Sequence, residues 1–391
     1  MSDISDVCKF SVQRLYLTSD KNTGIAYASR KRPNLIMAVT RSQSRSLSKS
    51  RQTRATKKKL TRVVAEHYNA RKGASNVDRK LSHVMNLRNF NNWIKSMLIR
   101  KYVDKIKRKK DRRAAKKAHS IVPVQNNGQC QHKIKVLDLC CGKGGDLLKW
   151  EKSNVTHLAC VDIAEESVKE CNDRYVQMSK KREQYFTAEF IVHDCTKAGL
   201  AKKLIHKKKQ FDIVSCQFAL HYSFESRRQV KNLLKNASRN LRSGGYFIGT
   251  MPNESELLSR WYATKENKYG NNIYNVEFYC EKLNPPFYGA KYHFYLKDAV
   301  NCPEFLVNSV TLQQLALKYG LKFIVFKSFS DYFDKMKEVG KQLMYKMQVP
   351  YPPHHNDCNS RNSRKGCRTL SQAEWEVITL YSVFVFQKNK D

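Results

Sequence analysis

The chain has 391 residues, 41% of them hydrophobic, and carries a formal net charge of +39 at pH 7. This length allows one large domain or two smaller ones, and the hydrophobic content supports a packed core, which excludes a chain disordered throughout. The basic excess favours polyanionic partners, chiefly nucleic acid. The longest apolar run, near residues 377–386, is too short to cross a bilayer, so no membrane partner is expected.

The twelve cysteines include no CxxC pair. This spacing predicts neither a metal site nor a disulfide framework, and it favours a reducing compartment.

The N-terminal region is predicted to be a disordered basic tail. Residues 1–60 are rich in Ser, Arg, Lys and Thr and contain few large apolar residues, so they cannot bury enough surface to fold. We expect residues 61–391 to form the folded domain.

A long basic helix is predicted next. Apolar residues recur at helical spacing over 78–99, and the helix is expected to continue through the Lys- and Arg-rich stretch 101–117. Pro123 and the Asn-Asn-Gly that follows predict a linker. Residues 100–133 are therefore interpreted as a basic helix extension and linker.

From residue 135 the chain alternates between apolar strands and helices. The strands are predicted at 136–139, 157–163, 188–194, 211–220 and 246–252, and the helices at 145–152, 165–180 and 226–241. This alternation predicts a parallel sheet covered on both faces. A polar insertion (254–310), a helix (311–319) and strands at 321–329 and 377–387 follow, with a loose stretch at 345–369 before the last strand.

The most informative motif is VLDLCCGKGGD at residues 136–146. A buried strand leads into a turn with Gly142, Gly144 and Gly145, and a helix starts near Asp146. Glycines let the backbone turn sharply and approach a ligand closely. The loop lacks the G-x-G-x-x-G of dinucleotide-binding enzymes. Its acid at the helix start suits the cationic S-adenosylmethionine (SAM) better than a phosphate.

Polar side chains stand at the ends of the next three strands, where an open parallel sheet binds its ligand. Asp162 lies 20 residues after Gly142, where an acid can bond both ribose hydroxyls. Asp194 can accept the adenine amino group, and Gln217 can contact the ligand or its neighbour. The alternative for Asp162 and Asp194 is a structural role in the turns that end their strands.

Several further segments give the chain a family resemblance. They include LRNFNNWIKS (87–96), VDIAEESVKECNDRY (161–175), SCQFALHYSFES (215–226), GGYFIGTMPN (244–253), PEFLV (303–307) and SQAEWEVITLYSVFVF (371–386). With the Gly-rich motif, they make residues 63–387 resemble the eukaryotic mRNA cap guanine-N7 methyltransferases. Residues 1–60 and 100–133 are expected to lie outside the resemblance.

The resemblance implies a fold and a reaction. The fold would be the α/β Rossmann-like fold of SAM-dependent methyltransferases, a mostly parallel seven-stranded sheet with an antiparallel C-terminal strand. The reaction would move a methyl group from SAM to N7 of the cap guanosine by in-line displacement. No metal is expected, and no general base is needed because guanine N7 carries a free lone pair at neutral pH.

The resemblance also implies the site residues. SAM would be bound by Lys95, Cys140, Gly142, Asp162, Asp194, Gln217 and Tyr222. The cap would be bound by Asn91, Asn92, Lys143, Lys149, Arg174, His221, Glu304 and Tyr381. Of these, Glu304 belongs to the insertion 254–310, which would be the cap-binding insertion. His221, Tyr222 and Glu304 would align the reactants. Glu304 and His221 suit the donors and the O6 acceptor of guanine.

One position departs from the family pattern, which has Gly where this chain has Cys140. A Cβ there would weaken SAM binding if the backbone needs a positive φ. The alternative function is therefore a catalytically impaired cap- or RNA-binding protein. A SAM-dependent methyltransferase acting on small molecules is a third reading, disfavoured by the NFNNW motif and the basic charge.

The expected partners follow from the same resemblance. Capped RNA would be the substrate, with its phosphates also contacted by residues 101–117 and by the tail. A capping guanylyltransferase, the transcribing polymerase or a small activator are candidate protein partners of a monomeric catalytic unit in the nucleus.

Overall fold

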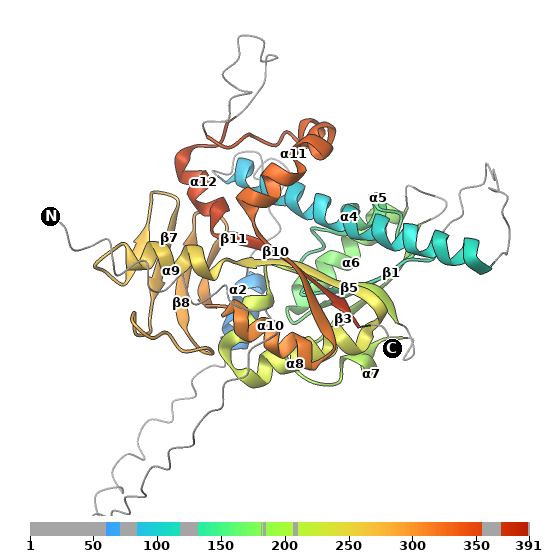
Figure 1. Ribbon diagram of the computed structural model, residues 1–391, viewed down its shortest axis with the longest axis horizontal. Coiled ribbons are helices and arrows are strands. Elements are labelled where there is room, and N and C mark those ends of the chain that lie inside the picture. The colour runs from blue at the N-terminus through green and yellow to red at the C-terminus, as the bar shows by residue number, and fades with distance from the viewer. Residues whose placement is uncertain are drawn as a thin grey trace, which may run out of the picture. The chain divides into compact units, whose positions relative to one another are not determined.

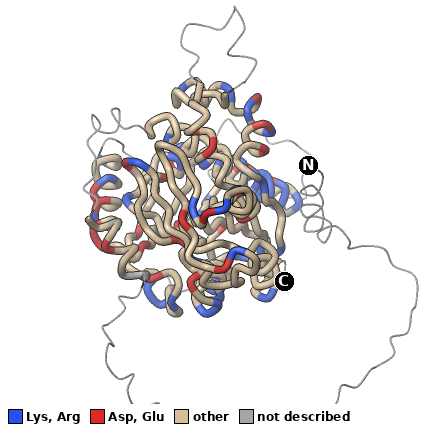
Figure 2. Tube along the Cα trace, turned by 90° about the vertical axis from the view of Figure 1, so that its left-hand side faces the viewer, with Lys and Arg blue, Asp and Glu red and all other residues tan. Residues whose placement is uncertain are grey.

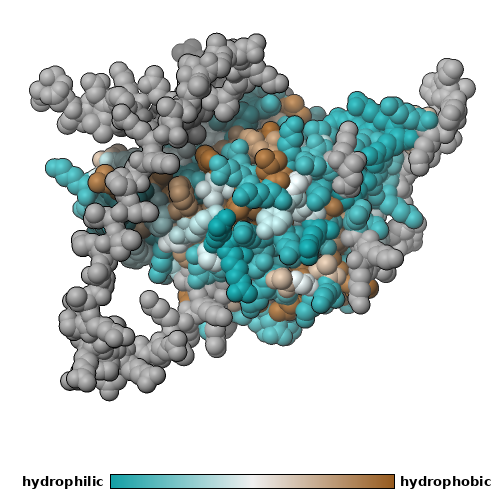
Figure 3. All heavy atoms as spheres, turned by 60° about the horizontal axis from the view of Figure 1, so that its bottom comes forward, coloured by the Kyte–Doolittle hydropathy of each residue, from teal (hydrophilic) through white to brown (hydrophobic). Residues whose placement is uncertain are grey.

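The computed structural model describes residues 60–70, 84–117, 132–180, 182, 185–205, 210–353 and 369–389. The predicted tail up to residue 59 and most of the predicted linker lie outside the described residues, and Leu60 begins α2 (Leu60–Ala70). Along the Cα trace drawn in Figure 2, Lys and Arg are interspersed with Asp and Glu. The face drawn in Figure 3 is mostly hydrophilic, with hydrophobic residues in small separate patches. Among the described residues, no helix combines the length and apolar character needed to span a membrane.

A seven-stranded sheet forms the centre of the fold (Figure 1). Its strands are β1 (Lys135–Leu139), β2 (His157–Asp162), β3 (Thr187–Val192), β4 (Phe211–Gln217), β5 (Leu241–Pro252), β10 (Leu321–Ser328) and β11 (Tyr381–Lys388). The order is β10-β11-β5-β4-β1-β2-β3, and β1 to β5 pair in parallel. β11 runs antiparallel to both of its neighbours. The predicted mostly parallel sheet with an antiparallel C-terminal strand is confirmed.

Helices cover both faces of this sheet. Successive side chains of a strand point to opposite faces, and apolar residues of these strands lie on both. Val136 and Cys160 belong to one core, and their neighbours Leu137 and Val161 belong to the other. The first core contains the apolar residues of α4 (Met85–Lys117), α5 (Leu147–Lys152), α6 (Glu165–Ser179), α11 (Phe329–Lys346) and α12 (Gln372–Thr379). The second contains those of α7 (Leu200–Lys203), α8 (Arg227–Asn240) and α10 (Ser309–Lys318).

The long basic helix is confirmed as α4, which is continuous from Met85 to Lys117; the predicted start at 78 lies outside the described residues. Trp93 is fully buried, and its Nε1 donates a hydrogen bond to the carbonyl oxygen of Gly340 in α11 (3.3 Å). Further along, Lys110 pairs with Asp212 at the start of β4 (3.2 Å). The helix therefore crosses the sheet face from the carboxyl ends of the strands to their amino ends.

Residues 254–310 were predicted only as a polar insertion, and that description misses a second sheet. After α9 (Glu254–Tyr262), four antiparallel strands pair in the order β6-β7-β8-β9. They span β6 (Lys268–Gly270), β7 (Tyr274–Phe278), β8 (Lys291–Leu296) and β9 (Val300–Phe305). Val276, Phe278, Tyr292 and Phe294 are buried on one face, and polar residues alternate with them.

The prediction of a strand over 377–387 is wrong at its start, where α12 extends to Thr379. A capping box begins that helix: the Ser371 side chain accepts from the Glu374 N–H, and the Glu374 carboxylate accepts from the Ser371 N–H. The apolar residues of the last turn of α12 continue without a break into those of β11, so the sequence pattern predicts one long strand. Helix α11 was not predicted.

Candidate active site

The Gly-rich loop between β1 and α5 is held in left-handed backbone conformations. Gly142 has φ +52° and Gly144 has φ +74°. A Cβ at Gly144 would lie 2.7 Å from Sγ of Cys171, so only glycine fits. Cys140 also has a positive φ, +59°, a conformation that costs a residue with a Cβ about 1–2 kcal/mol. Cys140 therefore has the positive φ at which its Cβ is expected to weaken SAM binding.

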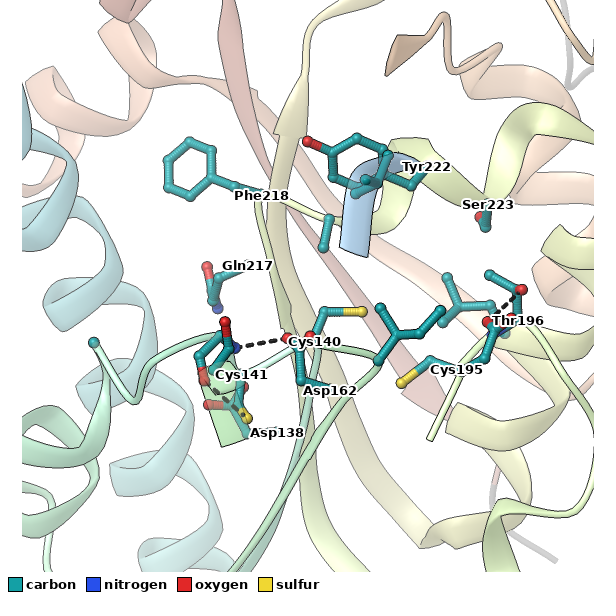
Figure 4. A pocket seen from close by; sticks show the side chains of 18 of the residues that line it. Asp138, Cys140, Cys141, Asp162, Cys195, Thr196, Gln217, Phe218, Tyr222 and Ser223 are labelled. Carbon is teal, nitrogen blue, oxygen red and sulfur yellow. Dashed lines mark hydrogen bonds between the residues drawn. The ribbon is translucent and has the colours of Figure 1, made fainter. Parts of the chain in front are cut away.

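A cavity of about 280 Å³ opens at the carboxyl ends of β1, β2 and β4 (Figure 4). The seven predicted SAM-binding residues all line it: Lys95, Cys140, Gly142, Asp162, Asp194, Gln217 and Tyr222. They come from α4, the loop after β1, and the ends of β2, β3 and β4, as well as the segment after β4. The structure thus brings together residues that span 128 positions of the sequence.

Asp162 is fixed by the backbone around it. One carboxylate oxygen accepts from the Gly142 N–H (2.8 Å) and the other from the Ala164 N–H (2.9 Å). Burial raises the pKa of Asp162, and these backbone hydrogen bonds act against the rise. Each oxygen keeps a lone pair for a further donor.

The other two strand-end residues are also held in place. Asp194 accepts from the N–H of Thr196 (2.9 Å) and from its hydroxyl (2.6 Å). Gln217 donates to Ser215 (3.1 Å) and accepts from Thr250 (3.2 Å). Asp194 therefore has the turn-stabilising role that was the alternative, and it also lines the cavity.

Asp146 also lines the cavity, and one of its oxygens is paired with two cations of the protein. One oxygen lies 2.7 Å from Nζ of Lys95 and 2.8 Å from Nζ of Lys149. Burial alone would raise the pKa of Asp146, but the two ammonium groups hold it well below its usual range. Burial lowers the pKa of Lys149, and Asp146 opposes this shift. Asp146 also precedes α5 instead of starting it, and its side chain makes no capping hydrogen bond.

Asp138 is a cavity residue to which no role was assigned from the sequence. It lies on β1, is buried, and accepts from Nε1 of Trp150 (3.3 Å). Burial, and secondly the negative charge of Asp146, raise the pKa of Asp138 to about 7. Asp138 makes no ion pair among the described residues, although the charge of Lys95 acts against the rise in its pKa. The acid inside an apolar strand was the available indication.

A tight turn after β4 supplies the opposite wall. The predicted strand 211–220 ends at Gln217, because Phe218 turns with φ +54° into the short helix η2 (Leu220–Glu225). The Phe218 N–H donates to the carbonyl oxygen of Thr250 (3.0 Å), which fixes the turn. Phe218 and Tyr222 both line the cavity (Figure 4), and the hydroxyl of Tyr222 lies 3.4 Å from Sγ of Cys302.

The predicted guanine-binding residues His221 and Glu304 contact each other. His221 Nε2 lies 3.3 Å from one Glu304 oxygen, and the other oxygen accepts from the hydroxyl of Tyr292 (2.8 Å). His221 is only 2% exposed and packs on Tyr222, with ring centroids 4.2 Å apart. The pair therefore lies directly behind a cavity residue, although neither member lines the cavity itself. Tyr381 packs edge-on against Phe218, at 5.0 Å.

The remaining predicted cap residues form two groups. Lys149 donates to Oδ1 of Asn92 (2.9 Å), while Oδ1 of Asn91 is buried without a hydrogen-bond partner in the described part of the chain. Lys143 and Arg174 both pair with Glu170 of α6. The cations predicted to follow the triphosphate are thus held near the Gly-rich loop by acids of the protein.

A family model matches most of the chain. The model of the mRNA (guanine-N(7))-methyltransferase domain matches residues 51–116 and 119–389. It covers nearly all of 100–133 and also 51–60, so the expectation that these residues lie outside the resemblance is wrong.

Curated relatives match over most of the chain. The mRNA cap guanine-N(7) methyltransferase of Drosophila melanogaster is 40% identical, over 85% of this chain and 78% of its own length. That of Caenorhabditis elegans is 35% identical, over 84% and 87%. The mRNA cap guanine-N(7) methyltransferase 1 of Oryza sativa subsp. japonica is 38% identical, over 84% and 81%. The chain therefore belongs to the mRNA (guanine-N(7))-methyltransferase family.

Proposed function

We propose that this protein methylates N7 of the cap guanosine of GpppN-RNA, with SAM as the methyl donor, as a step of nuclear mRNA processing. The observation that carries the proposal is the cavity, which gathers the seven predicted SAM-binding residues beside the His221–Glu304 pair. Nothing in the comparisons favours the alternative of a catalytically impaired cap- or RNA-binding protein.

The cavity residues suit SAM chemically. Asp162 keeps an acceptor on each oxygen for the two ribose hydroxyls, and Asp194 offers a carboxylate for the adenine amino group. Asp138 presents a buried carboxyl that makes no ion pair among the described residues, since the nearby Lys95 pairs with Asp146, so it suits the ammonium group at the methionyl end. Phe218 and Tyr222 supply apolar walls that exclude water from the sulfonium.

The proposed cap site lies beyond Tyr222. Glu304 would accept from N1–H and the amino group of guanine, and His221 would donate to O6. Tyr381 would contribute an aromatic surface for the base. The orphaned Oδ1 of Asn91 is a buried acceptor that needs a donor, which a cap hydroxyl would provide.

The proposed phosphate contacts require an exchange of partners. Lys143 and Arg174 would turn from Glu170 to the triphosphate bridge, and Lys149 would extend the same track. Exposed basic residues of α4, among them Arg108, Arg112 and Arg113, would contact phosphates of the RNA body.

Alignment accounts for the proposed catalysis. SAM supplies an electrophilic methyl on a positive sulfur, and guanine N7 needs no base to become a nucleophile. The residues around the cavity have only to hold the reactants in line, which can lower a barrier by about 7–11 kcal/mol. A capping guanylyltransferase, the transcribing polymerase or a small activator remain proposed partners of a monomeric catalytic unit.

The test uses a matched pair of variants on the four-stranded sheet. Glu304→Gln removes the buried carboxylate, and Glu277→Gln removes a solvent-facing carboxylate of β7 that bonds Tyr279. Losing a charged hydrogen bond costs about 1.5–3 kcal/mol, so kcat/KM for capped RNA should fall about 10- to 150-fold in Glu304→Gln only. S-adenosylhomocysteine binding, measured by calorimetry, should not change in either variant.

Two outcomes would overturn the proposal. The wild-type protein could bind both ligands yet leave N7 of GpppN-RNA unmethylated. Alternatively, Glu304→Gln could keep wild-type kcat/KM, which would remove Glu304 from the guanine site.

A further inference from the structure

Three cysteines meet behind the Gly-rich loop, and the proposed reaction does not use them as a group. Cys141 follows β1, Cys160 lies on β2, and Cys171 lies on α6. Their Sγ atoms all lie within 4.8 Å of one another. Cys160 and Cys171 are buried in the first core, whereas Cys141 is half-buried and lines the cavity (Figure 4). A small solute therefore has a route to the cluster through the cavity.

The number of ligands limits what this cluster can bind. None of the His, Cys, Asp or Glu residues that the structure describes adds a fourth ligand atom to the group. Structural zinc is almost always four-coordinate, so three sulfurs alone do not meet its preference. A three-coordinate, all-sulfur site favours a thiophilic centre that is satisfied by three bonds.

The net charge of the complex limits which ion the three cysteines can bind. The cluster lies among apolar residues such as Leu147, Trp150 and Leu158, where an uncompensated charge is costly. Three thiolates around a monovalent or divalent ion leave a net negative charge, but around a trivalent centre they leave none. We propose that Cys141, Cys160 and Cys171 form a binding site for trivalent arsenic, supplied as arsenite.

The bond-forming step balances without an oxidant or a reductant. Arsenous acid, As(OH)₃, condenses with the three thiols: three As–O bonds and three S–H bonds break, three As–S bonds form, and three waters leave. Arsenic stays trivalent, and both the reactants and the product are neutral. Trivalent arsenic is pyramidal, because it keeps a lone pair. With bonds of about 2.3 Å, as for zinc–sulfur, its three sulfurs would lie about 3.5 Å apart, so the thiols need to approach by no more than about 1.4 Å.

Ligation would act on the cavity through the loop. The Cys141 N–H donates to the Val161 carbonyl (3.1 Å), and the Gly144 N–H donates to the Cys141 carbonyl (3.2 Å). Gly144 also packs against Sγ of Cys171. The N–H of Gly142, the residue after Cys141, donates a hydrogen bond to Asp162. Pulling Cys141 towards Cys160 and Cys171 would shift these contacts. We expect arsenite to weaken binding of S-adenosylhomocysteine about tenfold; this effect alone rests on the proposed function.

The experiment measures arsenite binding directly, with the full chain. In native mass spectrometry, the wild-type protein should gain one arsenic and lose three hydrogens, and X-ray absorption should report three sulfurs around arsenic. Cys171→Ala should weaken binding at least tenfold. The control is Cys280→Ala, which removes a thiol from the loop after β7 and should bind arsenite like the wild type. Cys160→Ala provides a second test if Cys171→Ala does not fold, as judged by circular dichroism.

Three results would overturn the proposal. Folded Cys171→Ala or Cys160→Ala could bind arsenite as tightly as the wild type. X-ray absorption could report two sulfurs in place of three. Finally, zinc or copper(I) could bind with the same dependence on the three cysteines while arsenite does not, which would refute the trivalent assignment.

Discussion

The ion cluster of Asp146 with Lys95 and Lys149 predicts a large effect from a single atom-for-atom change. In Asp146→Asn the carboxylate disappears, and two ammonium groups remain side by side without their shared counter-charge. The side chains of Asp146, Lys95 and Lys149 are only 9%, 13% and 11% exposed, so water cannot replace the missing charge.

The magnitude follows from this burial. Removing one partner of a buried ion pair costs about 3–5 kcal/mol. Lys149 keeps hydrogen bonds to Asn92 and to the Gly145 carbonyl (both 2.9 Å), and Asn keeps an acceptor oxygen. We therefore expect the free energy of unfolding to fall by about 3 kcal/mol, the lower end of that range.

Urea unfolding near neutral pH is the appropriate assay. The pKa of Asp146 is held below its unfolded value, so the stabilisation is complete above the unfolded pKa and is lost only as the pH falls towards the folded one. The matched control is Asp334→Asn, which breaks an i,i+3 pair with Lys337 in which Asp334 is 66% exposed. That change should cost less than about 0.5 kcal/mol. If Asp146→Asn cost no more than Asp334→Asn, the assignment of a buried ion cluster would be wrong.

Three further changes test other features. Cys140→Gly should alter the free energy of unfolding by less than about 1 kcal/mol, because relief of the strain at φ +59° offsets the lost thiol and the added chain entropy. The measurement is urea unfolding, with Cys140→Ala for comparison. A Gly variant less stable than Cys140→Ala by more than about 1 kcal/mol would contradict this expectation. The raised pKa of Asp138, about 7, predicts that SAM affinity increases with pH through that value, because the carboxyl is neutral below it and ionised above it. Asp138→Asn should flatten the profile in calorimetry, and an equally flat wild-type profile would refute the role. A Cβ at Gly340 would lie 2.5 Å from the Trp93 ring. Gly340→Ala should therefore lower the free energy of unfolding by about 1–3 kcal/mol, measured in thermal or urea melts. The control is Val339→Ala, at an exposed position, and equal stability of the two variants would show that the contact relaxes freely.

The central sheet and the strand-end acids could be predicted because both depend on local patterns. Strands buried on two faces read as short apolar runs between helices. Parallel strands also bring their carboxyl ends to one edge, so Asp162, Asp194 and Gln217 could be assigned to one site before their distances were known. The positive φ at Cys140 could be posed as a question from the sequence, but only coordinates could answer it.

The features that were missed depend on contacts between distant residues. Lys95 reaches Asp146 across 51 positions, so the sequence could not show that the acid of the loop was already neutralised. Cys141 and Cys171 likewise have no metal-ligand spacing. The four-stranded sheet was missed because its strands are short and half polar, although the alternation in β7 and β8 was readable. The capping box at Ser371 is a local pattern that indicates the start of α12.

The position of β11 has a consequence for biosynthesis. This strand fills the gap between β5 and β10, yet it is translated more than a hundred residues after β5 and some fifty after β10. Until the ribosome has delivered it, β5 presents an unpaired apolar edge and β10 has no neighbour to join. A nascent chain would thus hold two open edges for the time taken to synthesise that interval, during which chaperone protection would be most needed.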